Sequence, residues 1–109
     1  MPRSSPHLLP ILSRILKEVG VNLKLARLRR KLSTAIIAER AQITRTTLRK
    51  IENGEGSVSM GAYASVLHCL GLHGDLAKVG AYDLLGQKLQ DAGLTEYRKR
   101  APKIKKIED

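Results

Sequence analysis

The side chains best suited to specific recognition lie between Thr44 and Asn53, where cations and hydroxyls alternate with apolar residues. Arginine and lysine pair well with the O6 and N7 atoms of guanine, and a threonine hydroxyl can meet a phosphate. If this stretch is a helix, its polar residues share the outer side, because residues three and four positions apart are neighbours. That side then carries four candidates for contact with DNA bases: Arg45, Thr46, Arg49 and Lys50.

Two short helices joined by a three-residue turn are expected to position these candidates. Apolar residues occur at helical spacing in Thr34–Ala41 and in roughly Arg45–Asn53, on either side of Gln42-Ile43-Thr44. Ser33 and Thr44 are suitable N-caps for the two helices. The inward residues are small or aliphatic: Ile37, Ala38, Leu48 and Ile51. Two helices joined in this way, with the second basic on its outer side, are typical of a helix-turn-helix DNA reader.

The remaining periodic segments predict an all-α fold in which five helices form the compact part. A first helix is expected over 11–31, in one piece or broken near Gly20, and a short one over 74–79. The helix from Ser59 to Leu70 should bury one stripe: Met60, Tyr63, Ala64, Val66, Leu67 and Leu70. A further amphipathic segment covers 82–92. We divide the chain into an N-terminal helical extension at 1–19, a DNA-binding domain at 20–80, and an amphipathic segment with a basic tail at 81–109.

The net charge of +10 is unevenly distributed along the chain. Residues 1–57 hold 12 Lys/Arg and 4 Asp/Glu, residues 58–91 hold 2 and 3, and residues 92–109 hold 6 and 3. The positive field therefore comes from the helix-turn-helix half and the tail, which is the footprint of a polyanion binder. A solvated basic surface that only aids solubility would give the same numbers. The tail from Thr95 to Asp109 is nearly free of large apolar residues and should be disordered in isolation.

Other kinds of site find little support in the residues. Cys69 is the only cysteine, so no disulfide can form within the chain, and it is expected to be a small buried residue. The three histidines lack metal-ligand partners at suitable spacing, and no acid–base constellation is evident. We expect no catalytic residue, metal or cofactor. The apolar pieces near the start are too broken for a signal peptide and too short for a membrane span. We therefore expect a cytoplasmic, nucleoid-associated protein.

Residues 20–72 resemble the Cro/CI-type (XRE) helix-turn-helix regulators, whose DNA-binding domain has the lambda-repressor-like fold. The resemblance lies in the alanine at the fifth position of the motif, Ala38, and in the Ile-Glu-Asn-Gly sequence at 51–54. It extends through Ser-Val-Ser-Met-Gly at 57–61 and Leu-Gly-Leu at 70–72. Two positions depart from the family pattern. Thr34 replaces the usual glutamine, and Gln42 replaces the usual turn glycine, so Gln42 must accept a left-handed conformation or the turn must differ.

This resemblance implies roles for individual residues. Arg45, Thr46 and Lys50 would read base edges, and Arg49 could reach bases or backbone. Thr34, Thr44 and Asn53 would hold phosphates. The cluster of Arg27, Arg29, Arg30 and Lys31 at the end of the first helix is compatible with phosphate contact, and equally with stabilisation of the helix dipole. We assign phosphate contact to Arg29 and Arg30.

A narrower resemblance joins the chain to the HipB-like antitoxin branch of this family. It lies in four runs: 22–32, 37–41, 61–67 and 84–89. It implies a repressor that binds a palindromic operator in double-stranded DNA, regulates its own operon and associates with a HipA-type toxin kinase. A homodimer is expected, with contacts from the 74–79 helix and from Leu84, Leu85 and Leu89, which lack an obvious partner within so small a domain.

Two alternatives stay open at this stage. The first is a protein-interaction module that neutralises a toxin kinase without specific DNA binding. The second is a nonspecific polyanion or RNA binder that uses charge alone. Three roles stay open for the basic cluster in the tail: contact with the DNA backbone, contact with an acidic partner, or an increase in solubility. The cluster consists of Arg98, Lys99, Arg100, Lys103, Lys105 and Lys106.

Overall fold

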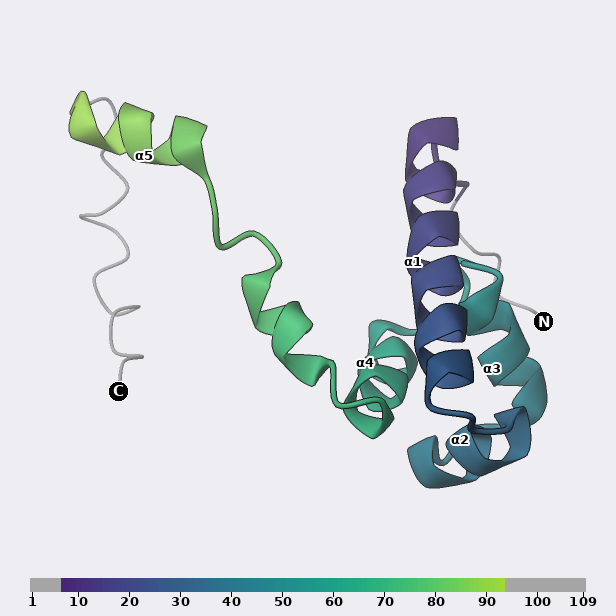
Figure 1. The fold of residues 1–109 in the computed structure, drawn as a ribbon. Helices are drawn as coiled ribbons and strands as arrows, with labels where there is room; N and C mark the ends of the chain where they lie inside the picture. The colour runs from purple at the N-terminus through teal and green to yellow at the C-terminus, as the bar shows by residue number, and fades with distance from the viewer. Residues whose placement is uncertain (1–6, 94–109) are drawn as a thin grey trace. The chain divides into compact units, whose positions relative to one another are not determined.

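The computed structural model describes residues 7–93, and the regular secondary structure of this part of the chain is all helical, with no strand. Six elements follow one another: α1 (Pro10–Arg29), α2 (Thr34–Ala41), α3 (Arg45–Glu52), α4 (Met60–Cys69), the 3₁₀ helix η1 (His73–Lys78) and α5 (Leu84–Asp91) (Figure 1). The prediction of an all-α fold is confirmed, whereas the count of five helices is not. The segment expected as a fifth α-helix is a 3₁₀ helix, because it is only six residues long and contains Gly74. The predicted basic tail lies outside the described residues.

The chain divides at Ala77–Lys78 into two compact units. The first contains α1 to α4, and the second contains α5. The predicted boundary between residues 19 and 20 falls inside α1. No residue of α5 is buried, so the described part of the second unit has no core around this amphipathic helix.

A single helix runs from Pro10 to Arg29, so the alternative of a break near Gly20 is wrong. Pro10 suits the first helical position, because a backbone N–H at that position has no partner within the helix and proline has none to leave unpaired. Gly20 is buried where α1 meets the end of α3: a Cβ atom there would lie 2.6 Å from the Glu52 carbonyl oxygen. The glycine is therefore needed for close contact between two backbones, and that contact offsets its poor helix propensity of about 1 kcal/mol. The helix ends two residues before the predicted limit because Lys31 is left-handed, with φ 55°.

Four helices end in the same left-handed turn, in which an N–H group bonds to the carbonyl five residues earlier. These bonds are Leu32 N to Arg27 O (3.2 Å), Ile43 N to Ala38 O (3.0 Å), Glu55 N to Lys50 O (3.0 Å) and Leu72 N to Leu67 O (2.8 Å). The left-handed residue is glycine at positions 54 and 71, but Lys31 and Gln42 serve at the other two. Of the two outcomes expected when glutamine replaces the turn glycine, a left-handed Gln42 or a different turn, the structure shows the first.

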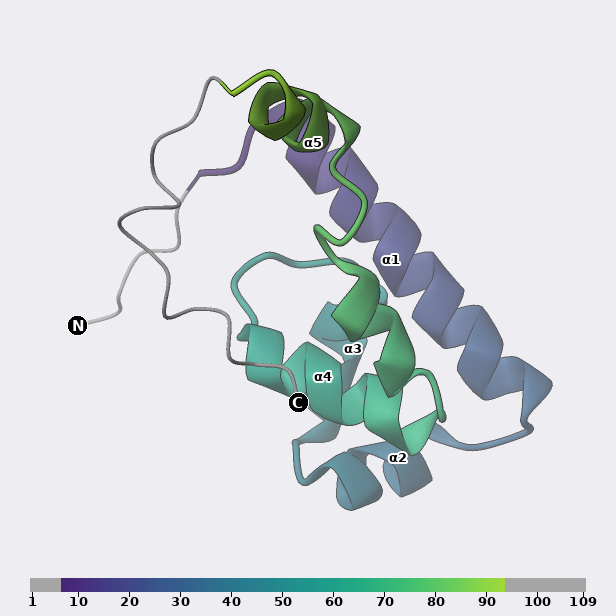
Figure 2. The same ribbon diagram turned by 90° about the vertical axis from the view of Figure 1, so that its left-hand side faces the viewer.

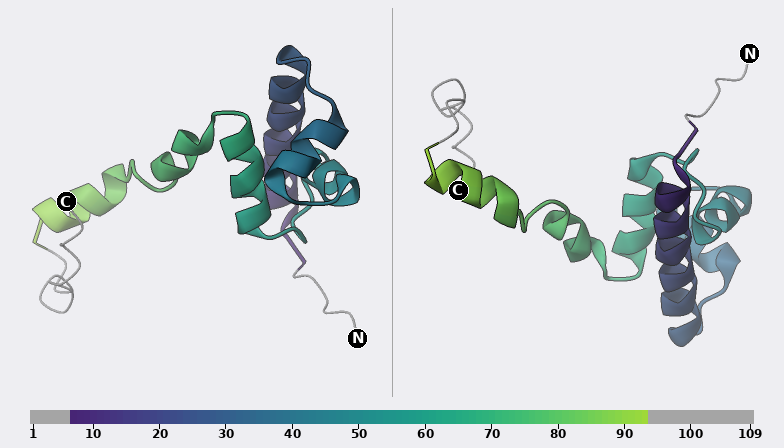
Figure 3. Two further views of the ribbon diagram at one scale, coloured as in Figure 1. Left: turned by 90° about the horizontal axis from the view of Figure 1, so that it is seen from below. Right: turned by 90° about the horizontal axis from the view of Figure 1, so that it is seen from above.

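The core lies where α2, α3 and α4 pack against the C-terminal half of α1 (Figures 2 and 3). Ile37, Leu48, Ile51 and Val66 are completely enclosed, and Ala38 is buried between the helices as predicted. The first turns of α1 extend beyond the other three helices, so Ile11, Leu12 and Ile15 stay exposed. The prediction that Met60 is buried is wrong: it is 72% exposed, since it begins α4 at the free end of that helix. Cys69 is only half-buried rather than buried.

Candidate nucleic-acid interface

α3 presents one apolar and one polar side, as its helical spacing predicts. Leu48 and Ile51 are buried against the core. The residues predicted to contact DNA from this helix and its cap are all exposed: Thr44, Arg45, Thr46, Arg49, Lys50 and Asn53. Thr46, Arg49, Lys50 and Asn53 share the side opposite Leu48 and Ile51, and Arg45 lies on its flank. The helix is therefore anchored by one side and offers the other to a ligand.

The turn between α2 and α3 is held by backbone and cap hydrogen bonds. After left-handed Gln42, the N–H of Ile43 returns to the Ala38 carbonyl, and the half-buried Ile43 side chain packs against the core. Thr44 caps α3, since its Oγ1 accepts from the Thr47 N–H at 3.0 Å. Ser33 caps α2 in the same way, accepting from the Ile36 N–H at 3.1 Å. These bonds set the angle at which α3 leaves the turn.

Thr47 is bonded to the predicted phosphate contact Thr44, although it was not among the predicted site residues. The Thr44 hydroxyl donates to Thr47 Oγ1 at 3.0 Å. The hydroxyl hydrogen of Thr44 is thus used inside the pair, and the hydrogen left to donate outward is that of Thr47. A phosphate contact donated by Thr44 would require its hydroxyl to turn away from Thr47. The contact between Thr44 and Thr47 could have been predicted from sequence, because the residue three positions after an N-cap faces that cap.

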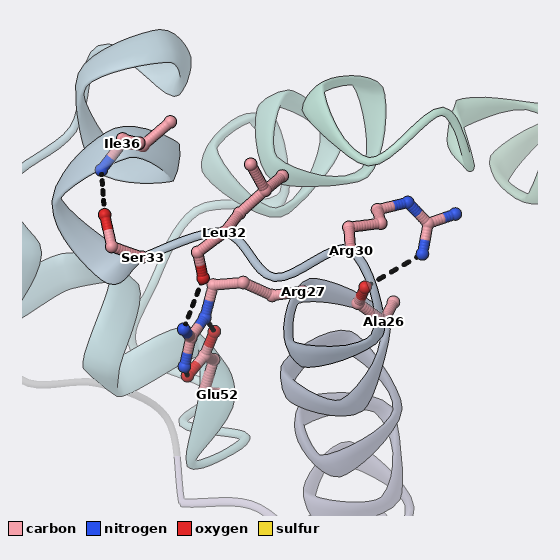
Figure 4. A network of polar contacts seen from close by, with 7 residues as sticks. All are labelled: Ala26, Arg27, Arg30, Leu32, Ser33, Ile36 and Glu52. Carbon is pink, nitrogen blue, oxygen red and sulfur yellow. Dashed lines mark hydrogen bonds and ion pairs between the residues drawn. The ribbon is translucent and has the colours of Figure 1, made fainter.

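A buried ion pair ties α1 to the end of α3 (Figure 4). Arg27 Nε donates to Glu52 Oε2 at 2.7 Å and Nη2 donates to Oε1 at 3.1 Å. Arg27 Nη1 also donates to the Leu32 carbonyl at 3.0 Å. The hydrogen bond to the Glu52 carboxylate raises the pKa of Arg27, and burial opposes this only in part. Of the two roles left open for the cluster that contains Arg27, phosphate contact does not suit Arg27 itself, because its guanidinium is used inside the protein.

The other two arginines of that cluster are exposed. Arg30 Nη1 donates to the Ala26 carbonyl at 2.8 Å, so this guanidinium satisfies an end carbonyl of α1. In Figure 4, Arg30 points away from Glu52, whereas Arg27 points toward it. No hydrogen bond or ion pair within residues 7–93 engages the Arg29 side chain. Thr34 is exposed at the first position of α2.

The interface carries uncompensated positive charge. Within residues 7–93, the Arg27–Glu52 contact is the single ion pair. The guanidinium and ammonium groups of Arg45, Arg49 and Lys50 thus have no acidic partner there. Glu52, the only acidic residue in α3, is turned into the ion pair and away from the exposed side. A surface of this kind attracts a polyanion and presents donors that suit guanine edges.

The comparison with known families agrees with this geometry. The family model described as a helix-turn-helix domain matches residues 18–79, more than half of the chain. The chain belongs to the helix-turn-helix domain family. The match spans α1 from Glu18 onward, the α2–turn–α3 unit, α4 and η1. Membership of this family supports a DNA-binding regulator. No curated protein matches the chain.

Two other kinds of feature are absent from the part of this helix-turn-helix protein that the structure describes. No group of three or more His, Cys, Asp or Glu side chains could hold a metal ion there. None of the helices described is long and apolar enough to cross a membrane.

Proposed function

We propose that this protein is a sequence-specific transcriptional repressor that inserts α3 into the DNA major groove. One observation carries the proposal: α3 is anchored by its buried side, and the cations on its exposed side have no acidic partner within residues 7–93. Arg45, Thr46 and Lys50 would read base edges, with Arg49 on bases or backbone. Thr34, Thr44, Asn53, Arg29 and Arg30 would contact phosphates. No catalytic role is proposed for any residue.

The proposed DNA-bound form is a homodimer on a palindromic operator. One eight-residue reading helix contacts few base pairs, so a second copy in the next major groove, about 34 Å away, would supply the remaining specificity. The second unit offers a surface for pairing, because the Leu84, Leu85 and Leu89 side chains are exposed. An isolated helix of two turns is marginal in water, so α5 would gain stability from covering this apolar side.

The finer proposal is that this repressor is the autoregulating antitoxin of a HipA-type toxin–antitoxin module. The support is the resemblance of runs 22–32, 37–41, 61–67 and 84–89 to the HipB-like branch. These runs lie in α1 and the turn that follows it, in α2, in α4 and in α5. The gene adjacent to this one provides the direct check, since the proposal requires it to encode a HipA-type kinase.

A gel shift on DNA from upstream of the protein's own gene tests the repressor proposal. The full chain is titrated at about 150 mM salt with excess competitor DNA, because nonspecific phosphate contacts weaken steeply as salt rises. Retention of one discrete complex is the expected result. A smear that disappears with salt would instead indicate a nonspecific polyanion binder. No shift, on this DNA or on sites selected from a random library, would indicate a protein-interaction module.

A further inference from the structure

A stripe of apolar side chains on the outer surface of α1 has no partner among the helices of its own unit, α1 to α4. Val21, Leu25 and Leu28 are 52%, 42% and 49% exposed. Their spacing of four and three residues places them on one side of the helix. The buried positions of α1 lie on the opposite side: Gly20, Leu23, Ala26 and Arg27. The stripe therefore faces away from the core of its unit.

The charges beside this stripe are mainly positive. Lys17 and Lys24, seven residues apart, follow one edge, and Arg29 follows the other together with Glu18. Arg14 continues the line of the stripe toward the N-terminus, and Glu18 is the only acidic residue beside it. All five are exposed, and none is held in an ion pair within residues 7–93. A shallow hollow opens at the N-terminal end, lined by Arg14, Lys17, Glu18, Val21 and Asn22.

This arrangement matches one half of a pair of packed helices, in which an apolar seam lies between two charged edges. A second copy of the chain fits it poorly. In an antiparallel pair Lys24 would meet Lys17 or Lys24 of the other copy, and in a parallel pair it would meet Arg29. Like charges repel in both cases. DNA would use the cations but would leave the apolar stripe uncovered.

We propose that the α1 stripe is the docking surface for an acidic amphipathic helix of another protein. Leucine or isoleucine side chains of that helix would cover Val21, Leu25 and Leu28. Glutamate or aspartate side chains at its edges would pair with Lys17, Lys24 and Arg29. This surface is separate from the exposed side of α3 and shares only Arg29 with the phosphate contacts proposed above, so the inference does not rest on DNA recognition.

The test uses a designed helical peptide, with leucine at the seam positions and glutamate at both edges, labelled for fluorescence polarisation. The full chain is expected to bind it at about 150 mM salt, where exposed charge pairs alone contribute little. A peptide of the same composition with scattered leucines is the control and should not bind. If both peptides bind alike, or neither binds, the proposal is wrong.

Matched variants locate the contact. Leu25→Gln should weaken peptide binding by at least about tenfold, because a buried leucine contributes more than that factor. Leu12→Gln, on the same helix at 44% exposure but on another side, should leave binding within about twofold. Lys17→Glu with Lys24→Glu should abolish binding of the acidic peptide and create binding of a peptide with lysine at its edges. An unchanged affinity of Leu25→Gln for the acidic peptide would overturn the assignment.

Two further measurements exclude other occupants. In sedimentation with vesicles rich in phosphatidylserine, Leu25→Gln should bind the vesicles as well as wild type does. If Leu25→Gln loses vesicle binding and the wild type does not bind the peptide, the stripe is a membrane-binding surface and the proposal is wrong. Light scattering should give the same oligomeric state for Leu25→Gln and wild type, whereas a change would indicate self-association through α1. Failure of the gel shift would leave these results unaffected, so the two proposals can fail separately.

Discussion

At the scale of single residues, the Arg27–Glu52 pair is a contact in which each partner depends on the other. Both side chains are almost excluded from water, with exposures of 9% and 8%, and their two hydrogen bonds are well formed. Removing one partner leaves a buried charge without compensation, whereas removing both does not. The pair also sets where α3 ends relative to α1, so its loss should affect the reading surface indirectly.

We predict that Glu52→Leu lowers the free energy of unfolding by about 3–5 kcal/mol, because Arg27 would keep its charge in a buried site. The double variant Arg27→Met with Glu52→Leu should recover most of this loss. Urea unfolding followed by circular dichroism measures both. A loss below about 1 kcal/mol for Glu52→Leu would show that Arg27 finds water when its partner is removed.

Base and phosphate contacts should differ in their effects on specificity. Arg45→Ala or Lys50→Ala should cost about 1–3 kcal/mol of operator binding and relax the base preference at one position. Arg29→Ala should weaken all sequences alike and reduce the salt slope by about one. Selection from a random DNA library, followed by salt titration of the chosen site, distinguishes the two. Unchanged selectivity in Arg45→Ala would mean that the reading residues are assigned wrongly.

At the scale of the elements, the turns that end the helices contain two unfavourable residues. Gln42 and Lys31 are left-handed, with φ 59° and 55°, a conformation that costs an L-residue about 1–2 kcal/mol. Gln42→Gly should therefore stabilise the domain by about 0.5–1 kcal/mol, after the greater entropy of glycine in the unfolded chain is subtracted. Asn53→Gly is the control, since Asn53 is right-handed and should gain nothing. Thermal unfolding that ranks the two variants equally would contradict this account.

The loop between α3 and α4 is tied to α4 by Tyr63, whose hydroxyl donates to the Glu55 carbonyl at 2.7 Å. Burial, and then the negative charge of Glu55, raises the pKa of Tyr63 above its usual value of 10.0. An unfolded tyrosine therefore ionises first, so this contribution is complete below about pH 10 and is lost as pH rises through the folded pKa. Tyr63→Phe should be less stable than wild type by about 1 kcal/mol at neutral pH.

The same difference should shrink above about pH 10, as wild type loses the contribution that the variant never had. Urea unfolding of both proteins across this range measures it. A difference that is constant with pH would show that the Tyr63 phenol is not protected in the folded state.

At the scale of the whole molecule, the apolar side of α5 should hold two copies together. Leu85 is 68% exposed and shares this side with Leu89, and no residue of α5 is buried. We predict that the wild type is a dimer at micromolar concentration and that Leu85→Gln with Leu89→Gln is a monomer. Size-exclusion chromatography with light scattering measures this, and Leu12→Gln serves as an exposed control. A monomeric wild type, with or without DNA, would contradict the homodimer proposal.

Much of this fold could be predicted from sequence because its signals are local. N-caps at Ser33, Thr44 and Ser59 and the left-handed stop at Gly54 each depend on residues within one helical turn. The pattern of inward aliphatic residues in α2 and α3 likewise specifies which sides pack. For the same reason the exposure of the α3 candidates could be predicted before any coordinates.

Only the tertiary structure decided what similar residues do in different places. Arg27, Arg29 and Arg30 are indistinguishable as a sequence cluster. Yet Arg27 is buried against Glu52, 25 residues away, Arg30 caps its own helix, and Arg29 has no ion-pair partner within residues 7–93. From sequence alone, Gly20 is a residue that weakens a helix. The structure shows that it contacts the backbone at Glu52 so closely that a side chain cannot fit. Helical spacing shows which residues share a side, but which side is covered depends on contacts between distant parts of the chain.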